Sequence, residues 1–486
     1  MSAPNLLTGK LPQAVPRRPN DYCLAGWLFL RVIALIYLAA FASLAVQVTG
    51  LVGADGILPV ADYLARARSA LGSHALWQIP TIFWLDSSDV ALRLACLTGI
   101  AASAAVFFNV LARTGLLLCY ALYLSLVYAG QEFLSFQWDM FLLEAGFLAL
   151  FLTGGSRIVI WLYRWLLFRF MFMGGVVKLA SGDSTWRDLT AIHYHFETQP
   201  LPSPLAWYAH QLPDQVLRSA TGSVFVIELL VPVFVFLPRR FRLFAAASFL
   251  VLQGTIMLTG SYNFFNLLTV ALCVFLLEDR DIRPFLGVKL SNRIVENARS
   301  VSERATVSAG LMGLVTLSVC GTLLWQTNTH QRAIQPLYGL VQLTATLALV
   351  NGYGPFAIMT TERREIIVEG SNDAQSWHAY EFKYKPGDVT KPLKWNIPHQ
   401  PRLDWQMWFA ALGEASGTPW FLSFMEKIQA GSKPVLSLLQ RDPFPERPPR
   451  YLRASLYRYS FATPEVRSSR GQVWQREFMG IYHPAR

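Results

Sequence analysis

Charged residues are scarce in this sequence. They make up 15% of its 486 residues, whereas hydrophobic residues make up 53%; an ordinary soluble domain is roughly 25% charged. A disordered chain is excluded, because such chains are poor in apolar residues. The formal net charge is nevertheless +11. By composition alone, this excess of positive charge could serve to bind nucleic acid, to bind an anionic membrane surface or to hold loops in the cytoplasm. The distribution of the charges along the chain distinguishes these roles.

Cysteines are also few, and none has a partner at a useful spacing. There is no C-x-x-C pair and no pair at metal-binding spacing. This argues against a disulfide-stapled ectodomain and against a thiol oxidoreductase. All five cysteines lie inside or at the edge of apolar runs: Cys23, Cys96, Cys119, Cys273 and Cys320.

Motifs that carry chemistry are absent as well. The chain has no G-x-S-x-G nucleophile elbow, no P-loop and no glycine pattern for a dinucleotide. No internal repeat of about 20 to 50 residues is apparent. An enzymatic activity therefore cannot be derived from any motif in this chain.

What the chain does have is a series of long hydrophobic runs. A helix needs about 20 apolar residues to cross the roughly 30 Å hydrocarbon core of a bilayer. The fold class we predict is a polytopic α-helical membrane protein with about nine spans. They lie near residues 24–46, 92–111, 115–130, 139–153, 158–180, 222–238, 243–259, 264–277 and 306–326.

The basic residues indicate the orientation of these spans. Lysine and arginine fall in every second loop, as with the trio Arg239, Arg240 and Arg242, and such loops stay cytoplasmic. We therefore expect residues 1–23 inside, a transmembrane domain over 24–326, and both the 181–221 loop and the 327–486 domain outside. The first span is read as an uncleaved anchor, because its apolar region exceeds that of a signal peptide.

Several ionisable residues lie inside the predicted spans, where each needs a partner or a polar cavity. We expect Arg164 and Arg169 to pair with Asp139 and Glu144 of the preceding span, which would fix helix register. The alternative is a polar cavity that opens outward with Lys178 near its mouth, where a buried lysine could act as a base. The intramembrane charge network that we predict contains Asp139, Glu144, Arg164, Arg169 and Glu228.

The segment from 181 to 213 combines prolines with aromatic residues and is predicted to be an ordered cap on the helices. Its prolines at 200, 202 and 204 force an extended path. His193, His195 and Glu197 would share one face of a strand, a set that could hold zinc or iron. No further ligand stands at a suitable spacing, so we favour a hydrogen-bonded loop and predict no metal and no cofactor.

After about residue 327 the pattern becomes that of a β-rich domain. Residues 364–369 and 377–384 read as two strands of a sandwich or barrel. Residues 398–413 read as a helix with Trp405, Trp408 and Phe409 on one face. The arginine-rich tail from 441 to 486 carries a strand pattern, and its external position argues against nucleic acid as a partner.

Two blocks of the sequence, residues 185–213 and 351–411, resemble the lipase maturation factor family. The resemblance implies a polytopic membrane protein, in animals of the endoplasmic reticulum, that helps secreted lipases fold and assemble without a cofactor. It implies an exported client such as a lipase, and membrane lipids, as partners. The family-like positions that we expect to be fold-defining or client-facing are Trp186, Asp188, Tyr194, Glu197, Gln199, Asn351, Tyr353, His399, Gln400, Arg402, Asp404, Trp405 and Trp408.

Two features favour a bacterial member of that family. The chain has no N-x-S/T glycosylation acceptor, and it ends in HPAR without a retrieval signal. We therefore expect the bacterial inner membrane, or the endoplasmic reticulum membrane if the chain is eukaryotic.

Two weaker resemblances supply alternatives to a chaperone-like maturation factor. Residues 170–186 are similar to a membrane stretch of the vitamin K-dependent carboxylases, in which a lysine at the position of Lys178 is the base. The segment around residues 366–377 resembles the loop and strand of discoidin-like jelly rolls, which implies a module that binds glycans or lipid headgroups. The leading prediction remains a maturation factor that is not an enzyme.

Overall fold

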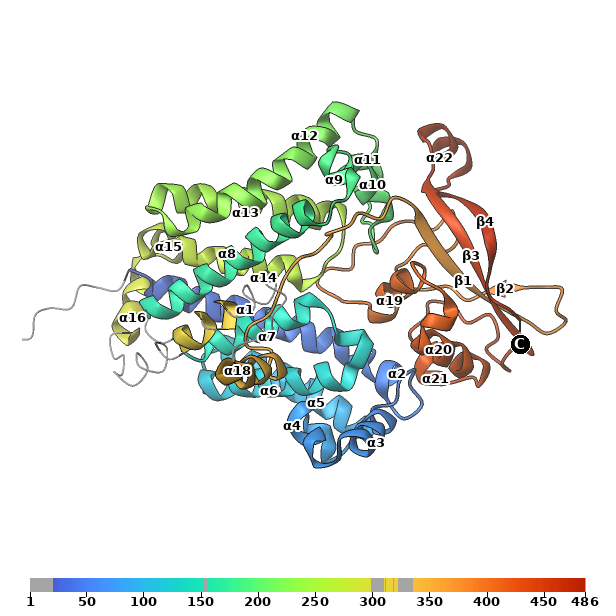
Figure 1. Ribbon diagram of the computed structural model, residues 1–486, viewed down its shortest axis with the longest axis horizontal. Coiled ribbons are helices and arrows are strands. Elements are labelled where there is room, and N and C mark those ends of the chain that lie inside the picture. Colours follow the sequence, from blue (N-terminus) through green and yellow to red (C-terminus); the bar gives the residue numbers. More distant parts are fainter. Residues whose placement is uncertain are drawn as a thin grey trace, which may run out of the picture.

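The computed structural model describes residues 21–152, 156–298, 310, 312–317, 319–321 and 335–485. Figure 1 shows a large helical part and, at one end of it, a small sheet with its own short helices. We call residues 21–298 the helical region and residues 349–485 the C-terminal region. The predicted domain boundary near residue 327, the start of the predicted N-terminal segment, and most of the predicted span at 306–326 lie outside the described residues.

Six helices in the described part of the chain are long and apolar enough to cross a membrane. The nine predicted spans are therefore not confirmed: residues 139–153 form a helix of only 13 residues, α7 (Gln137–Ala149), and residues 264–277 form α14 (Phe264–Leu272) and a short 3₁₀ turn. The orientation stays a prediction. The six helices are α1 (Cys23–Ala45), α5 (Asp89–Phe107), α6 (Ala112–Gly130, with a turn to Leu134), α8 (Arg157–Ala180), α12 (Asp214–Phe225, continued to Phe236) and α13 (Arg239–Thr259).

The helix that begins with α12 changes its winding before it ends. A π-helical turn spans Val226–Leu230 and a 3₁₀ turn spans Val231–Phe236. Pro232 lacks the backbone donor that a regular α-helix would need there. The irregular turn carries Glu228, and π-turns of this kind often occur at functional sites.

Helix α7 is almost entirely buried among the longer helices. Its Asp139 and Glu144 are as deeply buried as its apolar neighbours. A close approach to α1 is possible because position 146 is glycine: a Cβ atom there would overlap the hydroxyl of Tyr37. The burial of two carboxylates on one short helix requires partners for both.

Shorter helices complete the two regions. In the helical region they are α2 (Val48–Val52), α3 (Val60–Leu71), α4 (Ala75–Gln78), α9 (Ser184–Arg187), α10 (Ala191–Thr198), α11 (Ala206–His210), α15 (Asp279–Leu286) and α16 (Val288–Ala298). Helix α18 (Gln335–Thr346) precedes the C-terminal region, which holds α19 (Arg402–Ala410), α20 (Pro419–Gln429), α21 (Lys433–Leu436) and α22 (Pro464–Arg470).

The C-terminal region contains one antiparallel sheet in the order β2-β1-β3-β4. Its strands are β1 (Arg363–Ser371), β2 (His378–Ala379), β3 (Tyr451–Phe461) and β4 (Trp474–His483). The predicted strand at 364–369 and the strands in the tail are present. The predicted strand at 377–384 is reduced to the two residues of β2 and a single bridge at Glu381.

The predicted β-sandwich is not confirmed, because helices instead of a second sheet cover the described sheet. On one face Ile366 and Val368 belong to the hydrophobic cluster that contains residues of α19 and α20. On the other face Ile367 packs with Phe196 and Trp207, from α10 and α11. Alternating residues of β1 are thus buried on both faces of the sheet, and the 181–213 segment covers the face that carries Ile367.

The 181–213 segment is ordered but differs from the predicted extended path in its first part. Residues 191–198 form helix α10, so the prediction of a shared strand face for His193, His195 and Glu197 is wrong. Residues two positions apart on a helix are separated by about 200° around the axis. Ile192 and Phe196, four positions apart, instead form the buried face of this helix.

Candidate functional site

The polar side chains of the family-like blocks meet where the helical region contacts the C-terminal region. We call this set of contacts the junction. Two buried ion pairs, a buried cluster of three charged residues and a group of backbone contacts make up the junction and its immediate surroundings. A cavity lies next to it, below α9 and α10.

The first ion pair joins Asp139 of α7 to Arg402 of α19. The two guanidinium nitrogens Nη1 and Nη2 lie 2.6 and 2.7 Å from the carboxylate oxygens, and both side chains are buried. Tyr123 of α6 also donates to this carboxylate, at 2.5 Å. The prediction that Arg164 pairs with Asp139 or Glu144 is therefore wrong: its Nε donates to the carbonyl oxygen of Phe275 at 2.9 Å.

The second ion pair joins Glu144 of α7 to Arg169 of α8, as the sequence predicts. Tyr353 donates its hydroxyl to Glu144 at 2.7 Å, and Asn351 donates both its backbone N–H and its side-chain amide. Arg169 in turn donates to the carbonyl oxygen of Asn351 at 2.9 Å. The start of the C-terminal region is thereby fixed to the short buried helix α7 and to the membrane-length helix α8.

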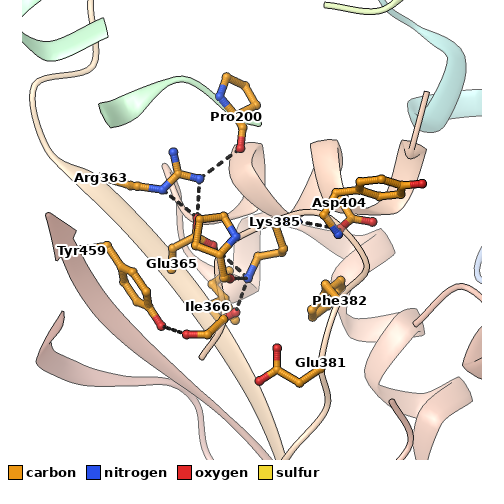
Figure 2. A network of polar contacts seen from close by, with 12 residues as sticks. Pro200, Arg363, Glu365, Ile366, Glu381, Phe382, Lys385, Asp404 and Tyr459 are labelled. Atoms are coloured by element: carbon orange, nitrogen blue, oxygen red, sulfur yellow. Dashed lines mark hydrogen bonds and ion pairs between the residues drawn. The ribbon is translucent and has the colours of Figure 1, made fainter. Parts of the chain in front are cut away.

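The third buried group is a cluster of three charged residues, centred on Glu365 of β1 and shown in Figure 2. Arg363 and Lys385 bind opposite oxygens of this carboxylate, at 2.6 and 2.8 Å. All three side chains are almost fully buried. Such a group is costly to bury unless every member has partners, and here each charge has them.

Arg363 also ties the sheet to the segment that follows α10. Its guanidinium donates to the carbonyl oxygens of Glu197, Gln199 and Pro200, at 2.8, 2.5 and 3.0 Å. Figure 2 shows the contact with Pro200. The prolines at 200, 202 and 204 keep this stretch extended and expose its carbonyl groups to the arginine.

Side chains of the same segment make the reciprocal contacts. Glu197 accepts a hydrogen bond from the backbone of Phe461 in β3 at 2.7 Å. Trp408 of α19 donates to the carbonyl oxygen of Thr198 at 2.8 Å. Gln199 donates to the carbonyl oxygen of Thr259, at the end of α13, also at 2.8 Å. The segment from 197 to 200 thus connects a membrane helix, the sheet and α19.

The turn before α19 contacts the end of α1. His399 shares a 2.9 Å hydrogen bond with the hydroxyl of Ser43, which also accepts from the backbone N–H of Gln400 at 2.8 Å. Burial, followed by the charge of Lys383, lowers the pKa of His399 to about 4. This histidine is therefore neutral at physiological pH.

Asp404 fixes the first turn of α19 to the segment after β2. Its carboxylate accepts from the backbone N–H groups of Tyr384 and Lys385 at 2.7 and 2.9 Å, and the second contact is visible in Figure 2. Burial raises the pKa of Asp404 above its ordinary value, against the effect of these donors. Asp404 is buried, so its contacts serve the fold.

A cavity of about 170 Å³ lies between α8, α12, α13 and α14, under α9 and α10. Lys178 of α8 borders it and is bound by three acceptors: Glu228 Oε2 at 2.8 Å and the carbonyl oxygens of Gly174 and Pro355 at 3.1 and 3.3 Å. The ring of Trp186 lies 5.3 Å from the Lys178 ammonium. A base would have to leave these acceptors, so the geometry does not favour the carboxylase-like alternative.

The histidines that the sequence offers as metal ligands are used separately. His193 Nε2 lies 2.8 Å from Asp214, whereas His195 stacks on Tyr262 beside the cavity. Removal from water, followed by the charge of Lys178, lowers the pKa of His195 to about 4. Within the part of the chain that the structure describes, no group of three potential ligands could hold a metal ion.

Most of the family-like residues are buried and act in the fold. Asp188 and Tyr194 are the exposed members of that set, whereas Gln400, Arg402 and Asp404 are among the most deeply buried. Whether any of them contacts a client stays a prediction. The sequence analysis did not single out Tyr123, Ser43, Arg363, Glu365 or Lys385. For Arg363 and Glu365 a signal was available, because they are charged residues within a β-branched strand.

In the loop that resembles jelly-roll binding loops, the polar groups form hydrogen bonds with one another. Asp373 accepts from the backbone N–H groups of Gln375 and Ser376 and from the Ser371 hydroxyl, at 2.7 to 2.9 Å. These donors lower the pKa of Asp373. The loop is a self-contained turn between β1 and β2.

Comparison with known proteins identifies the family. The family described as the lipase maturation factor transmembrane domain matches residues 24–284, and the lipase maturation factor C-terminal domain matches residues 349–484. The chain belongs to the lipase maturation factor family. No solved structure matches it.

Curated relatives within the lipase maturation factor family cover nearly the whole chain. Lipase maturation factor 2 of Gallus gallus is 36% identical, over 96% of this chain and 81% of the relative. The human lipase maturation factors 1 and 2 are each 34% identical, over 96% and 94% of this chain and 88% and 82% of their own lengths. These relatives are named as maturation factors and not as enzymes, which fits the prediction.

The membership supports an integral membrane protein concerned with lipase maturation. It gives no support to the expected bacterial inner membrane, because the relatives named above come from a bird and a mammal. Neither the carboxylase-like nor the glycan-binding alternative gains support from the lipase maturation factor relatives.

Proposed function

We propose that this chain is a membrane-anchored chaperone for a secreted lipase and holds its client non-covalently through the C-terminal region. Membership of the lipase maturation factor family supports the client class. The observation that carries the mode of action is the exposed edge of the sheet. The C-terminal region would then lie on the exported side of the membrane, as the basic loops predict.

Strand β4 forms one edge of the described sheet and pairs there with β3 alone. Ten residues long, it exposes Phe478, Met479 and Ile481, whose relative exposures are 56%, 41% and 51%. Natural proteins usually shorten, charge, bulge or cover such an edge, because it can pair with another chain. The first half of β4 carries Arg476 and Glu477, and its pairing with β3 is irregular near Gly480, but residues 478–481 are apolar and largely exposed. An extended apolar segment of a partly folded client could add as a further strand.

The junction would give this edge a fixed position relative to the membrane. The pair Asp139–Arg402, together with the hydrogen bonds that Asn351 and Tyr353 donate to Glu144, connects the two regions through buried contacts. A client held at β4 would therefore stay at a constant distance from the bilayer while it folds or assembles, without a covalent step.

The test compares secreted lipase from cells that express variants of the full chain. Phe478→Glu/Ile481→Glu should lower the specific activity of the lipase several-fold without changing its transcript, because charges at these positions oppose apolar strand addition. Leu412→Glu, at an exposed apolar position off the sheet, is the matched control. Unchanged lipase activity with the β4 variant, at equal amounts of membrane protein, would overturn the proposed contact surface.

A further inference from the structure

The cavity beside Lys178 has the composition of a lipid-binding site. Most of the side chains around it are apolar, among them Phe170, Met171, Val224, Leu252 and Ile256. A few polar groups also line it: the bonded pairs Lys178–Glu228 and Gln253–Asn266, and His195. An apolar pocket with few convergent polar groups is the usual form of a small-molecule site.

One polar atom in this cavity has no partner. The Asn266 side chain, 3% exposed, donates to Gln253 Oε1 at 2.5 Å, and its own Oδ1 has no hydrogen-bond partner. A buried polar atom without a partner costs about 1–3 kcal/mol. A ligand that donates a hydrogen bond to Asn266 would remove that cost.

The remaining polar groups define the kind of head group. The ammonium of Lys178 already has three acceptors, so it has no spare donor for a carboxylate. Its charge is balanced by Glu228, and His195 is neutral because its pKa lies near 4. The polar groups that line the cavity therefore carry no net charge and offer acceptors, which suits an uncharged hydroxyl group.

The cavity reaches the surface between two membrane helices. Thr255 of α13 is exposed and Ala220 of α12 is partly exposed, and both border the cavity. Figure 1 shows α8, α12 and α13 along the same side of the helical region. On the outer side of α13, Val251 and Leu258 are exposed apolar residues, as expected of a helix that faces lipid. The opening thus faces the bilayer.

The volume limits how much of a ligand can enter. At about 170 Å³, the cavity is close to the ~150 Å³ of an engineered cavity that binds benzene. It can hold a small head group and the first few carbons of one chain, with the rest of that chain between α12 and α13. A phospholipid headgroup is too large and too strongly charged for this space.

We infer that the cavity between α8, α12 and α13 binds a single-chain, uncharged lipid with free hydroxyl groups, of the monoacylglycerol class. The hydroxyl group donates to Asn266 and the chain contacts the apolar walls. This binding is independent of the client contact proposed for β4, and neither requires the other.

The experiment uses the full chain in phosphatidylcholine nanodiscs. A monoacylglycerol with a diazirine in its acyl chain is the probe, and its O-methylated ether, which lacks hydroxyl donors, is the control probe. We expect labelled peptides from residues 214–236 and 239–259, at least 5-fold more labelling with the hydroxyl probe, and competition by excess monoacylglycerol but not by the fatty acid of equal length. This comparison requires no variant.

Two variants one helical turn apart test the entrance. Thr255→Trp should close the opening and reduce labelling at least 5-fold, whereas Val251→Trp, one turn away on the same exposed face of α13 and outside the cavity lining, should leave it unchanged. Asn266→Leu should make the two probes label equally. Labelling spread over all six membrane helices, equal competition by the fatty acid, or equal labelling of the two tryptophan variants would overturn the inference.

Discussion

Replacement of Arg402 by methionine tests whether the junction depends on a buried charge. The guanidinium makes four hydrogen bonds: two to Asp139, one to the carbonyl oxygen of Phe133 and one to the Tyr123 hydroxyl. Methionine retains much of the side-chain length but none of the donors. The Asp139 carboxylate would keep one donor, Tyr123, in a site that water does not reach.

The expected cost follows from the loss of one partner in a buried pair. Such a loss typically destabilises a protein by about 3–5 kcal/mol. An unfolding entropy of about 2.1 cal/mol/K per residue, summed over the chain, gives about 1 kcal/mol per degree. We therefore expect Arg402→Met to lower the melting temperature by about 3–5 °C. The double variant Asp139→Asn/Arg402→Met should lower the melting temperature by less than half as much, because no uncompensated charge remains buried.

The assay is thermal unfolding of the full detergent-solubilised chain, followed by size-exclusion chromatography after heating. Arg364→Met is the matched control: this arginine pairs with Glu362 at the surface, where an ion pair contributes about 0–1 kcal/mol. If Arg402→Met and Arg364→Met shifted the melting temperature equally, or if the double variant were the least stable, the account of the junction would be refuted.

Three further predictions concern the neighbouring groups. Arg363→Leu should abolish recovery of folded protein, because it leaves one oxygen of Glu365 and three carbonyl groups without their donor. Arg364→Leu should have little effect, as measured by monodisperse yield. As the pH is lowered from 6.5 to 4, the melting temperature should fall. His195 and His399 have folded pKa values near 4, so they bind protons in this range only when the chain unfolds. A His195→Gln/His399→Gln variant should show a shallower fall in melting temperature, and an equally steep fall would contradict this account. Lys178→Met should destabilise the chain, because it leaves the Glu228 carboxylate without its partner. The double variant Lys178→Met/Glu228→Leu should recover stability and still support lipase secretion. A double variant that is stable but inactive would instead indicate that Lys178 has a chemical role.

Local features of the structure could be predicted because the hydrophobic period is local. The long helices, β1 and α19 follow from runs and alternations within about 20 residues. The signal for α10 was also present, in the four-residue spacing of Ile192 and Phe196, but the alternation of His193 and His195 suggested a strand. The sandwich prediction is not confirmed, because helices cover both faces of the described sheet and the sequence of a strand does not reveal what covers it.

The pairing of charges shows where local reasoning ends. Arg164 and Arg169 lie five positions apart, so they project about 140° apart around α8, and the same holds for Asp139 and Glu144 on α7. Two neighbouring helices could therefore satisfy one of these pairs but not both. Arg169 and Glu144 face one another, and this leaves Asp139 directed elsewhere. Its actual partner lies 263 residues away in the sequence, beyond the reach of any periodicity.

The burial of these pairs also bears on where a client can bind. Polar residues that must be satisfied inside a protein stand out in a sequence, because a charge or an amide is unusual in an apolar setting. Arg402, Asp404 and Gln400 stood out in this way, and they are enclosed by the junction. A contact surface for varied or partly folded clients has no such constraint on residue type. Phe478 and Ile481 look like ordinary strand residues in the sequence, and only their exposure on an unpaired edge makes them candidates for contact with a lipase.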